Sequence, residues 1–214
     1  MLKLARGDLL EYKMFGNRFY KINDPILNDF LKVWGLIEVE HQDRNYVYQR
    51  TLKSYLKIKK KFHEYKGYLA EIYMIQVLWN CQRKILPGIF FNSPVDIQMP
   101  ERFLFIDQRH RQHTGISIEI DIYADATPEI WIAESKWQNK PVGIEIVFQL
   151  LKQKEIVIER EGDDLEKLTL WLFSYSGVTT EADNFMKKNG ILWSSKDNLN
   201  ALLKYSGLRN LPEI

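Results

Sequence analysis

Two acidic side chains and a lysine occupy positions in this sequence at which they could share a metal ion. Residues 116–123 alternate isoleucine with Ser, Glu, Asp and Tyr, so Asp121 lies on the polar face of a predicted strand. In the next segment, Glu134 and Lys136 stand two residues apart and point to one side. A turn at Thr127-Pro128 pairs residues equally distant from it, which predicts that Asp121 and Glu134 are cross-strand neighbours.

Neighbouring carboxylates repel each other unless a proton or a cation joins them, and their oxygens are ligands suited to Mg²⁺ or Mn²⁺. A divalent ion can activate water, and the ammonium group of Lys136 can stabilise charge on a phosphate. This combination suits hydrolysis of a phosphodiester bond. The alternative is an ordinary salt bridge across the sheet, in which Lys136 pairs with Glu119 or Glu134.

A third acid, Glu71, lies within a long helix predicted for about residues 63–83. Its neighbours three and four positions away provide an apolar setting: Gly67, Tyr68, Met74 and Ile75. A carboxylate that faces a core is costly unless it is paired or binds a metal, so Glu71 requires a partner. That partner is a metal ion, or the cation of a buried salt bridge, unless the helix register is shifted by one residue.

The elements around these residues predict an α/β domain with a mixed sheet. Helices between the last strands require parallel crossovers, so helices flank the sheet, and the order is α-β-β-β-α-β-α-β-α. The expected elements are a helix over 63–83, strands over 102–111, 116–125 and 129–136, a helix over 144–160, a strand over 168–175, a helix over 179–189, a strand over 191–193 and a helix ending near 204.

A smaller segment precedes this core. Gly16-Asn17 predicts the turn of a β-hairpin with strands over 8–15 and 18–22. Asp24 is expected to cap a helix that ends at Gly35.

Basic residues cluster between these two parts of the chain. Residues 50–66 contain seven Lys or Arg against one acid, which favours either a surface that follows phosphates or a solvated linker or helix face. Lys57, Lys59, Lys60 and Lys61 are the candidate nucleic-acid contacts, and Trp137 beside the acidic cluster is a further one.

Composition limits the alternatives. With 214 residues and 45% hydrophobic residues the chain has material for a buried core, and one cysteine, Cys81, excludes an internal disulfide framework. No run approaches transmembrane length and no signal-peptide core is present, so we expect a soluble, cytoplasmic protein without membrane partners. His110 and His113 are expected to be structural or solvent-facing.

These residues resemble the PD-(D/E)xK nuclease superfamily, in particular its Mrr-like and RecB-like branch. The similarity rests on the segment from Gly67 to Glu71, on Asp121, on Glu134-Ser135-Lys136, and on a crossover unit near residues 174–192. It covers about residues 63–204 and departs from the family pattern in having Ile120, not Pro, before the aspartate.

The resemblance implies a restriction-endonuclease-like core of the type αβββαβ and a set of roles. Asp121 and Glu134 would bind Mg²⁺ or Mn²⁺, Glu71 would bind or orient a metal-bound water, and Lys136 would position the water and the phosphate. Gln149 would be a further catalytic residue on the following helix. The expected activity is cleavage of DNA as an endonuclease or exonuclease; the alternative is a silent nuclease-fold module that binds nucleic acid or regulates an attached ATPase.

Residues 4–34 are similar to the wing and exit helix of a winged-helix segment in a P-loop ATPase family of archaea and bacteria. No glycine here is followed by lysine, so the phosphate-binding loop itself is absent. We therefore expect residues 1–60 to be a winged-helix remnant with a basic linker, residues 61–214 to be the nuclease domain, and an ATPase domain of the same parent protein to be a partner.

Overall fold

The computed structural model describes residues 10–13, 18–22, 25–111 and 119–213. The chain forms two compact units, residues 1–60 and 61–214. The second unit contains a five-stranded sheet in the order β5-β6-β7-β8-β9. Its strands are β5 (Phe105–Arg111), β6 (Glu119–Asp125), β7 (Glu129–Lys136), β8 (Lys167–Ser174) and β9 (Leu192–Ser195).

The sheet is mixed, as predicted. Strands β5, β6 and β7 form an antiparallel meander, whereas β7, β8 and β9 run parallel. Parallel neighbours need a crossover between them, and the chain supplies α4 (Ile144–Glu161) after β7 and α5 (Thr180–Lys188) after β8. The predicted order of helix, three strands, helix and strand is confirmed.

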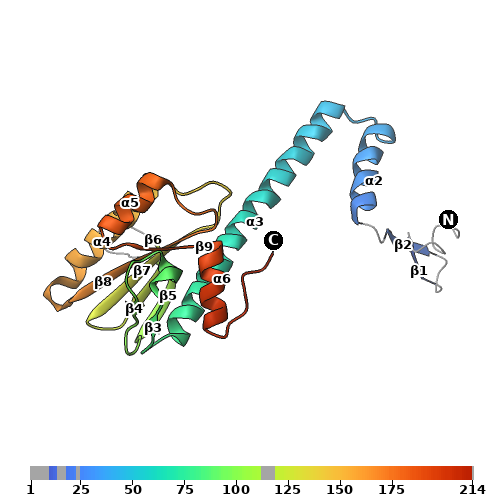
Figure 1. Ribbon diagram of the computed structural model, residues 1–214. Coiled ribbons are helices and arrows are strands. Elements are labelled where there is room, and N and C mark those ends of the chain that lie inside the picture. The colour runs from blue at the N-terminus through green and yellow to red at the C-terminus, as the bar shows by residue number, and fades with distance from the viewer. Residues whose placement is uncertain (1–9, 14–17, 23–24, 112–118, 214) are drawn as a thin grey trace. The chain divides into compact units, whose positions relative to one another are not determined.

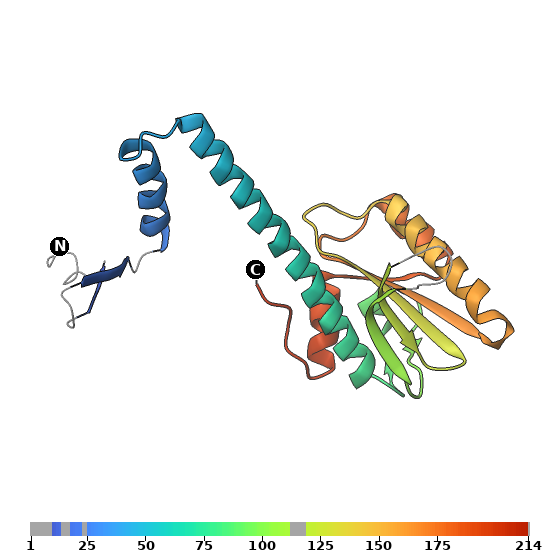
Figure 2. The same ribbon diagram turned by 180° about the vertical axis from the view of Figure 1, so that it is seen from behind.

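Helices cover both faces of this sheet (Figures 1 and 2). The C-terminal part of α3 (Arg44–Asn80) and α6 (Lys196–Tyr205) lie on one face, and α4 and α5 lie on the other. Because both faces are buried, β8 is apolar almost throughout its length. The face towards α3 includes Met74, Leu78, Ile122, Trp171 and Leu202, and the face towards α4 includes Val147, Leu150, Ile132, Leu172 and Met186.

Two short strands were missed by the sequence prediction. β3 (Ile85–Leu86) and β4 (Ile97–Gln98) form a separate antiparallel pair, with a 3-10 helix, η1 (Gly88–Phe91), between them. Two-residue strands do not produce a detectable alternation of apolar and polar residues. A second 3-10 turn, η2 (Gly162–Asp164), follows α4.

The first unit confirms the hairpin and corrects two helix boundaries. β1 (Leu10–Lys13) pairs with β2 (Arg18–Ile22), while the predicted turn and the Asp24 cap lie outside the described residues. Helix α2 (Pro25–Glu38) continues past Gly35, whose carbonyl accepts the amides of the two residues that follow the helix.

Helix α3 begins much earlier than predicted, at Arg44. The carboxylate of Asp43 accepts the amide of Tyr46 at 2.9 Å, which satisfies a free donor in the first turn. No Pro or Gly interrupts the chain from there to Gly67, so the basic segment expected as a linker is helical. Among the described residues, no helix is long and apolar enough to cross a membrane.

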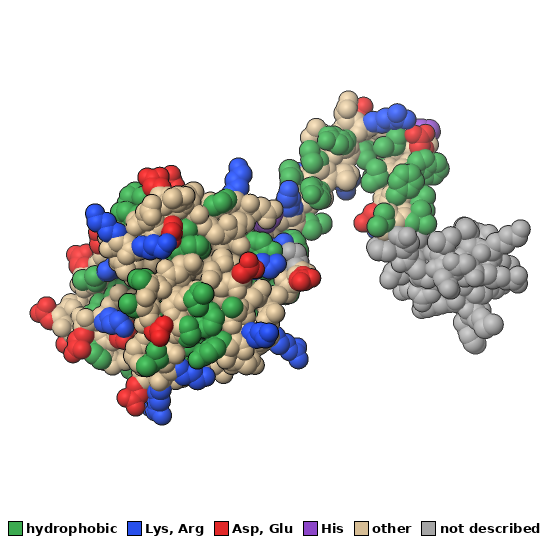
Figure 3. Space-filling model, viewed as in Figure 1, with side chains coloured by type: hydrophobic (Ala, Val, Ile, Leu, Met, Phe, Trp, Pro, Cys, Tyr) green, Lys and Arg blue, Asp and Glu red, His purple; other side chains and the backbone are tan. Residues whose placement is uncertain are grey.

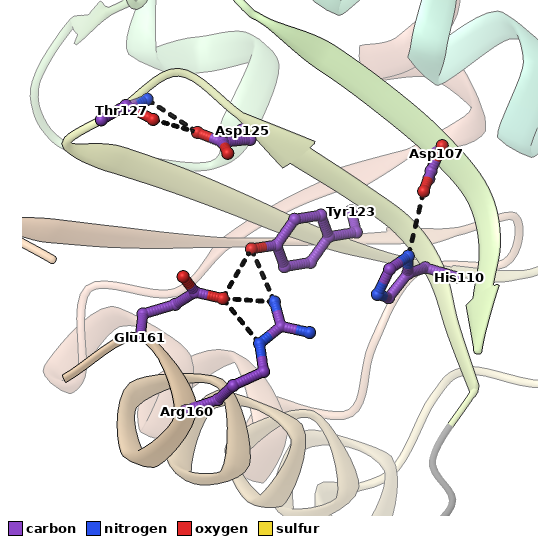
Figure 4. A network of polar contacts seen from close by, with 7 residues as sticks. All are labelled: Asp107, His110, Tyr123, Asp125, Thr127, Arg160 and Glu161. Atoms are coloured by element: carbon purple, nitrogen blue, oxygen red, sulfur yellow. Dashed lines mark hydrogen bonds and ion pairs between the residues drawn. The ribbon is translucent and has the colours of Figure 1, made fainter. Parts of the chain in front are cut away.

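A partly buried polar network fastens the end of α4 to the sheet (Figure 4). The hydroxyl of Tyr123 on β6 donates to Glu161 at 3.2 Å and accepts from Arg160 at 2.8 Å, and these two residues also pair with each other. Burial raises the pKa of Tyr123 to about 12. The ring of His110 stacks on Tyr123 at 4.8 Å between centroids, so this histidine has the structural role expected for it.

We expect Tyr123→Phe to lower the free energy of unfolding by about 1 kcal/mol, because the ring stacking stays while two partly buried hydrogen bonds are lost. Urea denaturation followed by circular dichroism measures the change. Tyr205→Phe is the matched control, since the Tyr205 side chain is on the surface and 56% exposed. An equal effect of the two substitutions would contradict a role for the Tyr123 hydroxyl.

Candidate active site

The candidate site forms where β6 and β7 part. The two strands pair from Asp125↔Ile130 to Ile122↔Ala133, which is the predicted symmetry about the Thr127-Pro128 turn. Beyond Ile122 the backbone ladder stops, and the carboxylate of Asp121 accepts the amide of Ser135 at 2.9 Å instead. A side chain therefore replaces the backbone in holding the strands together at this point.

Glu134 and Lys136 lie on β7 beside this fork and form an ion pair with each other. Their side chains are 12% and 27% exposed, so the pair is largely shielded from water. Gln153 on α4 reaches the same place, and its amide donates to the backbone carbonyl of Glu119 at 3.1 Å and approaches Glu134 at 3.5 Å. The salt bridge between Lys136 and Glu134, considered above as the alternative, is present.

Glu71 approaches from α3, on the other side of the sheet. Its side chain is 4% exposed and accepts hydrogen bonds from Gln108 at 2.7 Å and from two guanidinium nitrogens of Arg109 at 3.2 and 3.3 Å. The partner that a buried carboxylate requires is thus a cation from β5, one of the alternatives stated above. Neither Gln108 nor Arg109 was singled out from the sequence, because nothing in the strand pattern connects them with a helix far away in the chain.

The acids affect one another electrostatically. Burial, and next the negative charge of Glu134, raise the pKa of Asp121 to about 7, against the opposing effects of the Ser135 amide and Lys136. Burial acts to lower the pKa of Lys136, but Glu134, Asp121 and Glu71 together raise it above its ordinary value. Lys136 therefore stays charged, whereas Asp121 is protonated more readily than an ordinary aspartate.

The strand pattern breaks at the site itself. Ile120 and Ile122 were expected on one face, but Ile120 packs in the apolar cluster towards α4 and Ile122 in the one towards α3. The pairing of β5 with β6 passes from Gln108↔Ile122 to His110↔Ile120, and Arg109 between them has a left-handed backbone with φ of 55°. The broken alternation on β6 thus lies opposite a distorted residue of β5.

Two predicted site residues lie elsewhere. Gln149 on α4 is exposed, and within the described part of the chain no hydrogen bond joins it to the acids; Gln153, one turn later, is the glutamine that does. Trp137 is only 8% exposed, and its ring stacks on Tyr175 at 4.8 Å between centroids. Trp137 therefore lies in the core and presents little surface for the nucleic-acid contact predicted for it.

The basic residues of α3 are on the surface. Lys57, Lys59, Lys60 and Lys61 are all exposed. The Lys59 ammonium lies 5.9 Å from the ring centre of Tyr55. His113, like the rest of 112–118, lies outside the described residues.

No group of three His, Cys, Asp or Glu side chains in the described ranges is arranged to hold a metal ion. The chemistry of the donors at the fork nonetheless fits a hard cation, because Asp121 and Glu134 offer only oxygen atoms and raise each other's electrostatic energy. The hydroxyl of Ser135, the residue between Glu134 and Lys136, is also buried without a hydrogen-bond partner.

We expect Asp121→Asn to stabilise the protein at pH 8 by on the order of 2 kcal/mol. Because the pKa of Asp121 is about 7 when folded and about 3.9 in unfolded chains, its contribution to stability falls as pH rises from about 4 to 7. Asparagine keeps an acceptor for the Ser135 amide but carries no charge. Thermal melting in EDTA at pH 8 and pH 4 tests this, and the melting temperature should rise only at pH 8. Glu155→Gln is the control, because Glu155 is exposed on α4. A loss of stability of Asp121→Asn at pH 8 would refute the argument.

Comparison with known proteins gives limited similarity. No protein-family model matches the chain, and no curated protein matches it. Among solved structures, an EndoMS complex with double-stranded DNA matches 53% of this chain and 38% of its own at 18% identity and a TM-score of 0.34. The protein of unknown function AF1548 matches 49% of this chain and 58% of its own at 19% identity and a TM-score of 0.40.

A repair endonuclease from Pyrococcus abyssi matches 44% of this chain and 39% of its own, at 17% identity and a TM-score of 0.34. The chain thus spans between about two fifths and three fifths of the length of these structures. Identities and TM-scores this low carry no functional argument.

Proposed function

We propose that this chain is a metal-dependent nuclease that hydrolyses phosphodiester bonds, with DNA as its substrate. The supporting observation is the arrangement at the strand fork, where the Asp121 and Glu134 carboxylates act on each other beside the Lys136 ammonium group. A fold gains no stability from placing two acids together in a buried position. Their arrangement is therefore better explained by a cation that they bind.

Mg²⁺ or Mn²⁺ is the cofactor that this donor set suits. Asp121 and Glu134 would hold the ion, which supplies an activated water and neutralises charge on the phosphate. Glu71 would orient that water from the α3 side, since its own charge acts on Asp121 and Lys136. The resemblance to the PD-(D/E)xK superfamily assigns the same roles to these residues.

Residues of the chain itself prepare the reacting groups. The Ser135 amide fixes one oxygen of Asp121, and Gln153 restrains Glu134 from the opposite layer. Lys136 remains protonated because three acids surround it, so it can stabilise the negative charge that develops on the phosphate. The site therefore has acids held by hydrogen bonds and, in Lys136, an ammonium group that stays charged.

A second candidate is a nuclease-fold module that binds nucleic acid, or regulates an attached ATPase, without cleaving. One observation favours it: two of the three acids already have cationic partners, Arg109 for Glu71 and Lys136 for Glu134. The exposed lysines of α3 would then supply the affinity. Figure 3 shows that acidic and basic side chains are otherwise interspersed on the visible face of the sheet-containing unit.

The first candidate predicts that the purified protein cleaves DNA with Mg²⁺ or Mn²⁺ and stops when EDTA is added. Lys136→Ala should lower the rate by about 100-fold or more, because it removes the positive charge nearest the metal-binding pair. Cleavage of labelled duplex and single-stranded DNA on denaturing gels measures the rate. Thermal melting verifies that the variant is folded.

Lys152→Ala is the matched control, because Lys152 is exposed on α4 and is not part of the site. It should cleave as fast as the unchanged protein. If Lys136→Ala cleaves at that same rate, this site is not the source of the activity.

The second candidate predicts DNA binding with no metal-dependent cleavage. Lys57 and Lys61 lie one helical turn apart on one face of α3, so the double substitution Lys57→Ala and Lys61→Ala should reduce the slope of log affinity against log salt by about 2. Fluorescence anisotropy with a labelled duplex measures it, and Lys204→Ala on α6 is the control. An unchanged slope excludes α3 as the binding surface.

A further inference from the structure

We propose that Arg109 binds a phosphate group of the nucleic-acid substrate, so that the candidate site has a cation on each side of Asp121. Lys136 on β7 is one, and Arg109 on β5 is the other. This inference rests on the proposed function and extends it by naming a substrate-binding residue that neither the sequence pattern nor the family resemblance indicated.

The backbone shows that the position of Arg109 is unusual. It lies in the middle of β5, yet its φ of 55° is in the left-handed region, which costs a residue with a side chain about 1 kcal/mol or more. The β5–β6 register passes over Arg109 and Asp121 while pairing the residues on either side of them. The distortion thus occurs at the residue opposite the central acid of the site.

Within the described residues, the protein provides hydrogen-bond acceptors for only some of the N–H donors of the Arg109 guanidinium group. Its Nε and one Nη donate to Glu71 at 3.2 and 3.3 Å, which leaves further N–H donors of the five that arginine carries. The Arg109 side chain is 43% exposed, whereas Glu71 is 4% exposed. The group therefore has one edge bound in the interior and another facing water.

Two neighbours fix the direction of this group. The guanidinium carbon of Arg109 lies 5.5 Å from the ring centre of Tyr68 on α3, a distance at which the aromatic face attracts a cation. Gln108 donates to Glu71 at 2.7 Å and so helps to anchor the acid that orients Arg109. A planar group whose orientation is fixed in advance can bind a phosphate without a large further loss of side-chain entropy.

A salt bridge alone does not account for these features. Gln108 already gives Glu71 a strong hydrogen bond, and the strained backbone at Arg109 lowers stability rather than raising it. The negative charges of Glu71, Asp121 and Glu119 all act on Arg109. A fixed, half-exposed guanidinium on the strand next to Asp121 is suited to recognise a phosphate oxygen.

The test is binding of a fluorescein-labelled 20-base-pair DNA duplex in Ca²⁺, measured by anisotropy at several salt concentrations. Arg109→Gln should weaken binding about tenfold and reduce the salt slope by about 1, because one phosphate contact is lost. Arg102→Gln is the control, since Arg102 is an exposed arginine just before β5. Unchanged affinity and slope in folded Arg109→Gln would overturn the proposal.

A second measurement uses the unchanged protein, in case loss of Arg109 leaves Glu71 unpaired and the variant does not fold. Phenylglyoxal modifies accessible arginines, and mass spectrometry reports the extent at each position. The duplex should protect Arg109 and leave Arg102 as reactive as before. Equal modification of Arg109 with and without the duplex would refute phosphate binding.

The two proposals fail in different ways. If cleavage depends on Lys136, but Arg109→Gln binds DNA unchanged and the duplex does not protect Arg109, the protein is a nuclease without this contact. A protein that neither binds nor cleaves DNA removes the proposed function, and the phosphate site with it.

Discussion

The structure depends on a conflict between burial and charge at the point where β6 and β7 separate. A carboxylate, that of Asp121, takes the place of a backbone acceptor there and binds the Ser135 amide. The hydrogen bond favours a charged Asp121, while burial and Glu134 oppose it. Everything else around the site can be understood as supplying positive charge or donors to this crowded set of acids.

Two layers of the domain share that task. On the α3 side, Arg109 and Gln108 donate hydrogen bonds to Glu71. On the α4 side, Lys136 pairs with Glu134 and Gln153 approaches it. The network of Tyr123, Arg160 and Glu161 fixes the end of α4 on the sheet, and thereby the helix that carries Gln153. Polar contacts within the helix–sheet packing therefore determine the geometry of the acids.

Much of this arrangement follows from the sequence. The turn at Thr127-Pro128 predicted the β6–β7 register as far as Ile122↔Ala133, one pair short of Asp121 and Glu134, and the spacing of Glu134 and Lys136 predicted that they face one way. The apolar setting of Glu71 predicted that it needs a partner. What the pattern could not supply was the identity of that partner, because Arg109 comes from a strand distant in sequence and adopts a backbone conformation unusual for arginine. The glutamines of α4 show a related limit: helical periodicity defines a face of the helix but not which residue on it, Gln149 or Gln153, reaches the sheet.

The position of the site between two helical layers has a consequence for how it is assembled. Glu71 belongs to a helix that packs on one face of the sheet, and Gln153 to a helix on the other. Neither layer alone supplies both groups, so a chain that has lost either layer through local unfolding lacks one of the partners of these acids. The acids and their hydrogen-bond partners are therefore assembled only when both helical layers are packed on the sheet.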